Sequence, residues 1–313
     1  MRQRLFTYIF VFVALVTNGA FAQTATIAAG SSGTIHYNYA LALAKAANEI
    51  SGLDLRPKPF MSPGQGASSV DRGEVDFGVH NAIILREAYL GLEFYEGRAL
   101  TNLRAVARMI PFQTTLAVPG KSEIRTIEDM KGVRFPAGFD ATAFGDRLYE
   151  AILGTAGLSF DDVNVIHVND WAGLGKAFVG GEIDVGGLVV GAPTSTRYAE
   201  LVEGYRGISI RNDPEVEAQL QEIFPSSRLV VVEPAEGLAG VLEPLTVLEY
   251  DYWIFAHKDV PDETVTAFLT AMSQGKDILV SASKDFRDFD PELMHQDIGV
   301  PFHPAAEAFY AGR

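Results

Sequence analysis

A motif of the form Gly-Glu-x-Asp-x-Gly occurs twice in this chain, at residues 73–78 and again at residues 181–186. One copy alone would indicate little more than a helix end followed by the start of a strand. Each copy, however, follows a glycine loop at the same spacing, with Gly30 before the first motif and Gly138 before the second. This constant offset predicts two similar α/β units, each with a loop at the carboxyl ends of its parallel strands.

The pattern around each loop predicts the same order of elements, strand and helix in alternation, which is typical of a parallel sheet. In the first unit we expect a strand ending at Gly30, a helix over 40–50, a strand over 53–60, a short helix over 67–72 and a strand over 74–79. In the second we expect strands over 133–135, 163–168 and 181–186, with helices over 142–156 and 171–179.

Two apolar, β-prone runs at residues 114–118 and 250–257 separate the units and predict a two-stranded hinge. A helix over 262–273, opened by Pro261 and Asp262, would then return to the first unit. The predicted organisation is lobe 1 at 23–112 plus 251–313, lobe 2 at 125–245, and crossing segments at 113–124 and 246–257. A ligand is expected in the cleft, because pockets favour domain interfaces and strand carboxyl ends.

The first 22 residues have the features of a secretory leader. Arg2 and Arg4 precede an apolar run over 5–16, and Ala20-Phe21-Ala22 forms an A-x-A cleavage site. The apolar run is too short to cross a bilayer comfortably, and no later stretch predicts a membrane helix. We therefore expect a periplasmic protein, cleaved after Ala22 and not inserted in the membrane.

The composition excludes several classes of function. The chain has a net charge of −15, which argues against nucleic-acid binding, and its lack of cysteine excludes disulfides, thiolate metal sites and cysteine nucleophiles. Residues 173–176 lack the spacing of a phosphate-binding Walker loop, no serine-hydrolase motif is present, and no pair of its six histidines has helical metal-ligand spacing. We expect a binding protein without cofactor or metal, not an enzyme.

Several residues near the two loops can contact a ligand. Thr34 and Thr142 occupy equivalent helix starts, where a hydroxyl and free N–H groups either cap the helix or hold a carboxylate. His36 offers a donor or a titrating group, and Tyr37 an aromatic floor with a polar tip. Asp140 either caps the second helix or faces the cleft, where it would pair with an ammonium or repel a diacid.

Two further candidates come from the strand and helix ends beside the loops. Asn81 follows the first predicted Gly-Glu-x-Asp-x-Gly strand and offers both a donor and an acceptor. Trp171 begins the helix over 171–179, where it either lines the cleft or packs in the core.

The sequence resembles the TAXI branch of solute-binding proteins, the receptors of tripartite ATP-independent periplasmic (TRAP) transporters. The residues that carry this resemblance are the leader, the Gly-Ser-Ser-Gly loop leading to His36-Tyr37, and segments 102–107, 124–133, 156–158, 161–163, 260–265 and 300–310. The ending Phe-His-Pro-Ala-Ala-Glu at 302–307 is fairly specific to that branch, whereas Asp-Met-Lys-Gly at 129–132 is shared by many two-lobed binding proteins.

The resemblance implies an α/β, type II periplasmic-binding-protein fold with a ligand cleft between two lobes joined by two crossing strands. It implies capture of a small organic acid or amino acid, similar to glutamate or 2-oxoglutarate, and delivery to an ion-coupled TRAP permease by a monomeric receptor. Carried onto this chain, the ligand-binding residues would be Gly33, Thr34, His36, Tyr37, Asn81, Gly138, Phe139, Asp140, Ala141, Thr142, Gly191, Pro193 and Thr194. Trp171 joins this set from its position at a helix start, not from the resemblance.

This chain departs from the family pattern in both loops. The first loop usually has paired glycines and two tyrosines, and here reads Gly33-Thr34 with His36-Tyr37, while the second reads Phe139-Asp140-Ala141 in place of small residues. The two-lobed architecture also serves other functions. The alternatives are a receptor for an ATP-driven (ABC) importer of aromatic or sulfonated compounds and a sensory module or enzyme on the same scaffold.

Overall fold

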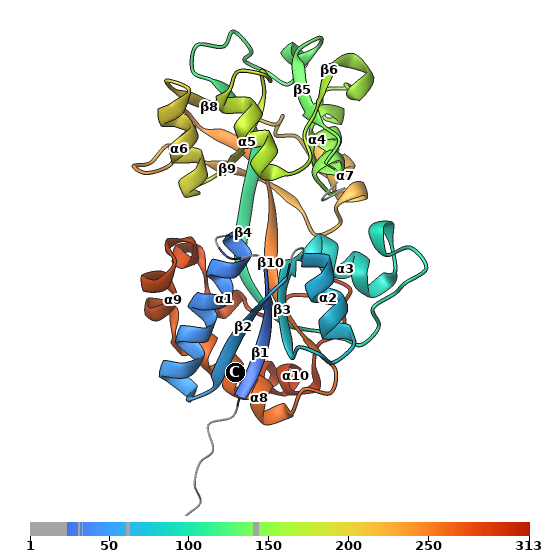
Figure 1. The fold of residues 1–313 in the computed structure, drawn as a ribbon, viewed down its shortest axis with the longest axis vertical. Coiled ribbons are helices and arrows are strands. Elements are labelled where there is room, and N and C mark those ends of the chain that lie inside the picture. Colours follow the sequence, from blue (N-terminus) through green and yellow to red (C-terminus); the bar gives the residue numbers. More distant parts are fainter. Residues whose placement is uncertain (1–23, 31, 33, 61–62, 140–143) are drawn as a thin grey trace, which may run out of the picture.

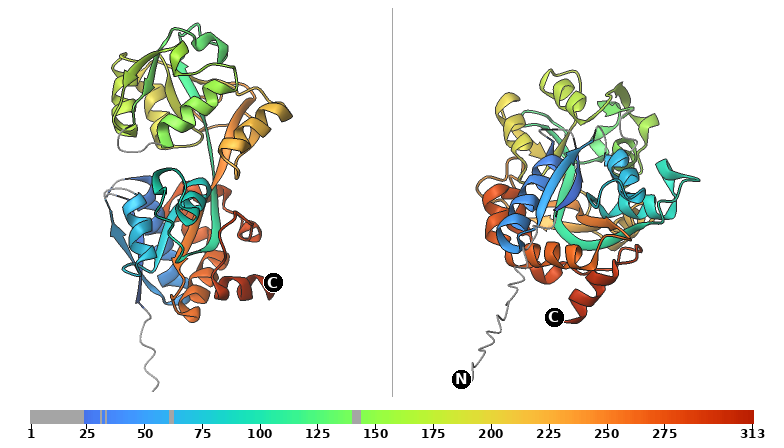
Figure 2. Two further views of the ribbon diagram at one scale, coloured as in Figure 1. Left: turned by 90° about the vertical axis from the view of Figure 1, so that its right-hand side faces the viewer. Right: turned by 60° about the horizontal axis from the view of Figure 1, so that its bottom comes forward.

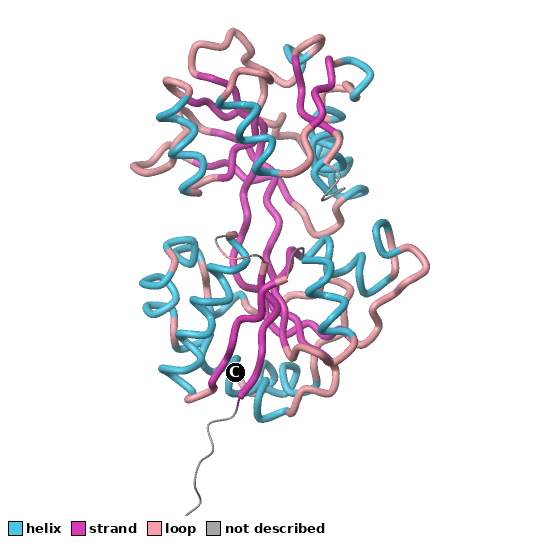
Figure 3. Tube along the Cα trace, viewed as in Figure 1, coloured by secondary structure: helices cyan, strands magenta, loops and turns pink. Residues whose placement is uncertain are grey.

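The computed structural model describes residues 24–30, 32, 34–60, 63–139 and 144–313. The chain folds into two α/β lobes that are connected by two long strands, β4 (Leu103–Pro119) and β10 (Leu245–His257) (Figure 1). These strands pair antiparallel from Leu248 and Thr114 at one end to His257 and Leu103 at the other. The two crossing segments predicted at 114–118 and 250–257 are thus parts of longer strands that enter both lobes (Figure 3).

Lobe 1 begins with a parallel sheet in which β1 lies between β2 and β3. Its elements are β1 (Thr24–Ala29), α1 (Ile35–Ala46), a π-helical turn (Ala47–Ser51), β2 (Asp54–Pro59), α2 (Pro63–Asp71), β3 (Phe77–Asn81), α3 (Ala82–Leu90) and the 3-10 helix η2 (Glu93–Tyr95). Strand β2 carries two prolines and lies at the edge of the sheet, where a missing N–H costs no ladder bond.

The sheet of lobe 1 is covered on both faces. Alternate residues of β1 show this: Ile27 belongs to the core beneath α1, and Ala28 belongs to the core beneath α2 and α3. The C-terminal segment returns to this lobe, as the helix predicted over 262–273 required (Figure 2). It comprises α8 (Asp262–Gln274), α9 (Lys276–Ala282), η5 (Lys284–Asp288), η6 (Pro291–Leu293) and α10 (Pro304–Ala311).

Lobe 2 has its own apolar core, which includes Phe135, Tyr149 and Phe178. Its elements are η3 (Glu128–Met130), β5 (Arg134–Ala137), α4 (Phe144–Gly154), η4 (Phe160–Asp162), β6 (Asn164–His167), α5 (Trp171–Val179), β7 (Gly186–Val189), α6 (Pro193–Leu201), β8 (Tyr205–Gly207), α7 (Pro214–Ile223) and β9 (Arg228–Val232). Strands β5 and β6 are parallel, β7 and β8 pair with β4, and β9 pairs with β10.

The repeated Gly-Glu-x-Asp-x-Gly motif has the same structure in both lobes. Gly73 and Gly181 each adopt a left-handed φ of 69°, which ends the preceding helix. The aspartate of each motif then bonds the neighbouring strand: Asp76 Oδ2 accepts from the Thr26 N–H at 2.7 Å, and Asp184 Oδ2 from the Arg134 N–H at 2.9 Å. The predicted repeat is therefore present in three dimensions.

Several element boundaries differ from the predictions. The first helix begins at Ile35 rather than residue 40, and the strands predicted at 74–79 and 181–186 begin later, because the motif itself forms the turn. Strand β7 pairs with β4 instead of β5, so the predicted three-stranded parallel sheet of lobe 2 has only two members. No helix in the part of the chain that the structure describes is long and apolar enough to cross a membrane.

Candidate ligand site between the lobes

A cavity of about 470 Å³ lies between the lobes, beside the crossing strands. Lobe 1 contributes Ile35 and Tyr39 of α1 and every residue of η5 except the buried Phe286. Lobe 2 contributes the β7–α6 loop and residues of β9 and the loop after it, and the floor is formed by residues 110–113 of β4. The cavity is thus built from both lobes and the hinge, which is the arrangement that the two-lobed prediction required.

The residues predicted to bind a ligand are distributed unevenly around this cavity. Gly191 lines it, and the helix start that carries Thr34, His36 and Tyr37 flanks Ile35 in its wall. Gly33, Asp140, Ala141 and Thr142 lie outside the described residues. Pro193 and Thr194 are exposed at the first turn of α6, next to the lining loop.

Thr34 and Asn81 both cap helices. The Thr34 hydroxyl accepts a hydrogen bond from the Tyr37 N–H at 3.3 Å, and Asn81 Oδ1 accepts from the Ile84 N–H at 2.8 Å. Gly30 makes the first cap possible, because a Cβ there would lie 2.5 Å from the Thr34 hydroxyl oxygen. The capping role foreseen for Thr34 is therefore real, and it leaves that side chain at the ligand-facing end of α1.

Two histidines lie behind this helix start, His80 buried and His36 half-buried. The His36 ring contacts the rings of His80 and Tyr252, with centroids 6.0 and 5.3 Å away. Burial lowers the pKa of His36 to about 4, and burial together with the neighbouring His36 lowers that of His80 to about 3. Both rings are neutral at pH 7, so His36 acts as a hydrogen-bonding group and not as a cation.

His36 and His80 differ in their hydrogen bonding. His80 Nδ1 accepts from the Asn81 N–H at 2.9 Å, which assigns the proton of the neutral ring to Nε2. His36 Nε2 is buried and has no hydrogen-bond partner within the described residues. An unpaired polar atom in a buried position is costly, and a ligand that bonds it would remove that cost.

In lobe 2 the N–H groups at the start of the equivalent loop already bond a side chain of the same lobe. The N–H groups of Gly138 and Phe139 donate to the Asp146 carboxylate at 2.7 and 3.2 Å. Gly138 has a φ of 81°, and a Cβ at this position would lie 2.3 Å from His167 Nδ1. Only glycine fits here, and its N–H is directed to Asp146 of α4.

The aromatic residues of lobe 2 form a layer on this loop. The Phe139 side chain is buried in the lobe 2 core, and the Trp171 ring covers it at 4.7 Å. Trp171 itself is 42% exposed, at the first turn of α5, where Asp170 caps the helix. An exposed indole on a buried phenylalanine offers an apolar surface for a ligand or partner.

Two cations at the cavity were not predicted from the sequence. Lys284 and Arg287 come from η5 of lobe 1, and Arg287 lies close enough to lobe 2 that a Cβ on Gly191 would be 3.7 Å from its Nη2. The Arg287 Nε donates to the Lys284 carbonyl at 3.2 Å, and neither side chain forms an ion pair with a described residue. No local sequence pattern identifies Lys284 and Arg287 as cavity residues, because their position depends on how the C-terminal segment returns to the hinge.

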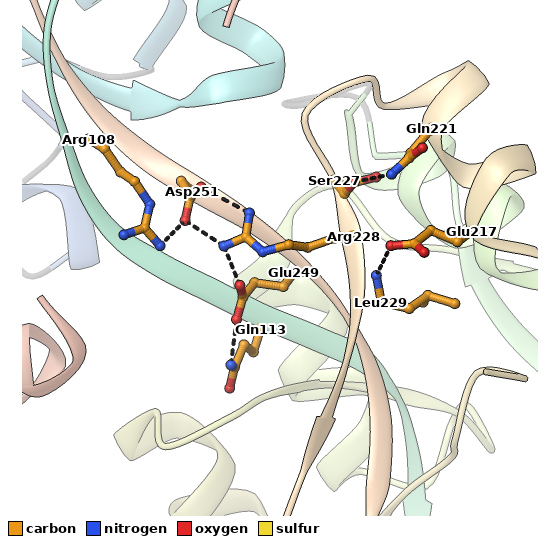
Figure 4. Close-up of polar contacts among 9 residues, drawn as sticks. All are labelled: Arg108, Gln113, Glu217, Gln221, Ser227, Arg228, Leu229, Glu249 and Asp251. Carbon is orange, nitrogen blue, oxygen red and sulfur yellow. Dashed lines mark hydrogen bonds and ion pairs between the residues drawn. The ribbon is translucent and has the colours of Figure 1, made fainter. Parts of the chain in front are cut away.

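A buried charge network fixes the hinge beneath the cavity (Figure 4). Asp251 of β10 bonds Arg108 of β4 at 2.7 Å and Arg228 of β9 at 3.1 Å. Arg228 also pairs with Glu249, whose carboxylate accepts from Gln113 at 2.6 Å. The network lies where the register of β10 shifts, between Asp251 and Trp253, and Gln113 connects it to the cavity wall.

The comparison with known families agrees with this architecture. Residues 27–312 match the model of the NMT1-like family. The chain belongs to that family. The match spans both lobes and the hinge, so the membership concerns the whole two-lobed unit and not one domain.

Solved structures share the fold at low sequence identity. A TctC solute-binding protein from Polaromonas is 14% identical with a TM-score of 0.57, and covers 93% of this chain and 94% of its own. PhnD1 from Prochlorococcus marinus, solved with methylphosphonate, is 12% identical with a TM-score of 0.54, covering 86% and 93%. XAC2383 from Xanthomonas citri, solved with chloride, is 12% identical with a TM-score of 0.51, covering 92% and 95%. These structural similarities confirm the two-lobed α/β fold that the sequence predicted.

Proposed function

We propose that this NMT1-like protein is an extracytoplasmic solute-binding receptor that closes on a small organic acid or amino acid. The observation that carries the proposal is the cavity of about 470 Å³ shared by both lobes and the crossing strands. Its volume is in the range of small-molecule sites, and its position between two hinged lobes suits capture by closure.

The chemistry of the wall supports the ligand class. Arg287 and Lys284 provide cations for a carboxylate, and Ile35, Phe112 and Leu238 provide apolar surface. The same wall carries carboxylates, including Glu233 and Asp288, which suit the ammonium group of an amino acid. An acid with a short apolar body, with or without an amine, matches this mixture.

The partner and the location rest on the sequence. The resemblance to the TAXI branch supports delivery to a TRAP permease, and the leader supports export with cleavage after Ala22. N-terminal sequencing of protein from the periplasmic fraction tests the cleavage. Membrane subunits encoded nearby without an ATPase would favour the TRAP partner over an ABC importer.

Calorimetry of the protein lacking residues 1–22 tests the binding function. We expect one member of a panel of dicarboxylates, keto acids and amino acids to bind and to raise the melting temperature. Arg287→Gln should weaken that binding about tenfold or more, since a charge-assisted bond is lost. Arg197→Gln, at an exposed arginine of α6 outside the cavity, is the matched control. Binding of methylphosphonate or an alkanesulfonate alone would instead favour the importer alternative.

A further inference from the structure

A third connection joins the lobes, separate from the crossing strands. Arg147 of α4 in lobe 2 reaches α3 of lobe 1, where its Nη1 lies 2.8 Å from Glu87 Oε1. Its Nε lies 3.7 Å from Glu93 Oε2 of η2, so one guanidinium faces two carboxylates of the other lobe. Figure 1 shows α3 at the top of lobe 1, directly below α4 and α7.

The contact has an apolar part as well as a charged one. Ile83 of α3 is only 2% exposed and packs in the core cluster of lobe 2, although its helix belongs to lobe 1. The Arg147 guanidinium also lies over the Phe224 ring, 5.4 Å from its centroid. A lobe 1 side chain that belongs to the lobe 2 core cluster shows that the two lobes are in apolar contact at this point.

The ion pair between Glu87 and Arg147 does not by itself hold the lobes together strongly. Burial raises the pKa of Glu87, although Arg147 acts in the opposite direction. The unfavourable desolvation of the Glu87 carboxylate therefore exceeds its favourable interaction with Arg147. Such a pair specifies how the surfaces meet, while the apolar contact of Ile83 favours their association.

The cavity lies on the other side of the crossing strands. Its walls come from α1, η5, the β7–α6 loop and the segment around β9, and neither α3 nor α4 contributes to it. In Figure 1 these elements lie to the left of β4 and β10, whereas α3, α4 and α7 lie to the right. The lobes thus touch on one side of the hinge and are separated by a cavity on the other.

We propose that the α3–α4 contact is a pivot, so that the lobes rotate about this contact and the hinge and the cleft opens only on the side of α1 and α6. The ligand then enters from that side, past η5 and the β7–α6 loop. The entry route rests on the proposed receptor function, whereas the pivot is a property of the protein without ligand.

Distance measurements between pairs of spin labels test the pivot directly. The chain has no cysteine, so two introduced cysteines are labelled without background. Leu90→Cys with Glu150→Cys spans the contact side, and Ala282→Cys with Glu200→Cys spans the cavity side, all at exposed positions of α3, α4, α9 and α6. In the protein without ligand we expect a narrow distance distribution across the contact and one about twice as broad across the cavity.

Variants of the ion pair distinguish a pivot from an incidental contact. Arg147→Met and Glu87→Gln should each broaden the contact-side distribution about twofold, because the lobes lose a fixed point. Arg211→Met, at an exposed arginine of lobe 2 away from lobe 1, should leave both distributions unchanged. Circular dichroism of each labelled variant verifies the fold, and Glu87→Gln provides the second reading should Arg147→Met not fold.

Two results would overturn the pivot. One is a contact-side distribution as broad as that of the cavity side in the parent protein. The other is a contact-side distribution that neither variant of the ion pair changes. Either could occur with ligand binding intact in calorimetry, so failure of the pivot is distinct from failure of the receptor function.

Discussion

The two lobes use one repeated scaffold but differ in chemistry at their equivalent glycine loops. In both, the aspartate of the Gly-Glu-x-Asp-x-Gly motif ties a strand start to its neighbour, through Asp76 and Thr26 in lobe 1 and through Asp184 and Arg134 in lobe 2. The glycine loops of the two lobes, in contrast, differ in their residues. The aspartate that positions the strands is therefore common to both lobes, whereas the loop residues are not.

The divergence is clearest at one pair of equivalent positions. Asp146 of lobe 2 holds the N–H groups of its own loop, whereas the residue at the same place in lobe 1 is the exposed Asn38. Lobe 1 instead has the half-buried His36, whose buried Nε2 has no hydrogen-bond partner among the described residues. In the part of the chain that the structure describes, lobe 2 therefore presents N–H groups already bonded to Asp146 beside an aromatic surface, and lobe 1 presents a polar ring atom that no described residue bonds.

The largest effect should come from the hinge, which the lobes share. Asp251→Asn leaves Arg108 and Arg228 without their common carboxylate, and removing one partner of a buried ion pair costs about 3 to 5 kcal/mol. Because the network joins β4, β10 and β9, we expect both lobes to lose stability together. Urea unfolding followed by circular dichroism measures the loss.

Each lobe has its own fluorescence reporter for this experiment. Trp253 is buried in lobe 1 and Trp171 is partly exposed on lobe 2, and the chain has no other tryptophan. In a Trp171→Phe background, Trp253 reports lobe 1 alone and should unfold together with the circular dichroism signal. Separate transitions would show that the lobes unfold independently and that the network belongs to one of them. Asp54→Asn, at an exposed ion pair, is the control.

A smaller effect on stability should distinguish the glycine loop of lobe 2 from that of lobe 1. Asp146→Ala removes the acceptor of two backbone N–H groups and should cost about 2 kcal/mol, since hydrogen bonds to charged groups are worth more than neutral ones. Asn38→Ala, the equivalent change in lobe 1, should alter the free energy of unfolding by less than about 0.5 kcal/mol. Urea unfolding of both variants compares them directly. Equal losses would mean that the loops are not held differently.

The sequence predicted the scaffold better than the site. Element order, the repeat and the two crossing strands follow from periodicity and glycine positions, which are local signals. The pairing of β7 with β4 and the approach of Arg287 to Gly191 are not local, because each depends on segments far apart in the chain. Phe139 illustrates the same limit: its position beside a ligand loop was predictable, but its burial beneath Trp171 was not.

The last effect should appear only in acid, and the neighbouring histidines of lobe 1 should contribute to it. His80 has a pKa of about 3 in the folded protein, below the ordinary value of 6.5, so the unfolded chain binds more protons and stability falls as pH decreases from about 6.5 toward 3. Above pH 6.5 this contribution is constant. The loss is at most about 1.4 kcal/mol per pH unit for each such histidine.

His80→Asn can keep an acceptor for the Asn81 N–H and removes the titrating ring, so its stability should depend less on pH between 6.5 and 4. His36→Gln should flatten the same range, because the pKa of His36 is lowered by burial to about 4. Urea midpoints at pH 7.5, 6, 5 and 4 test both against the parent. A slope that neither variant changes would place the acid sensitivity outside this pair and remove one of the differences between the lobes.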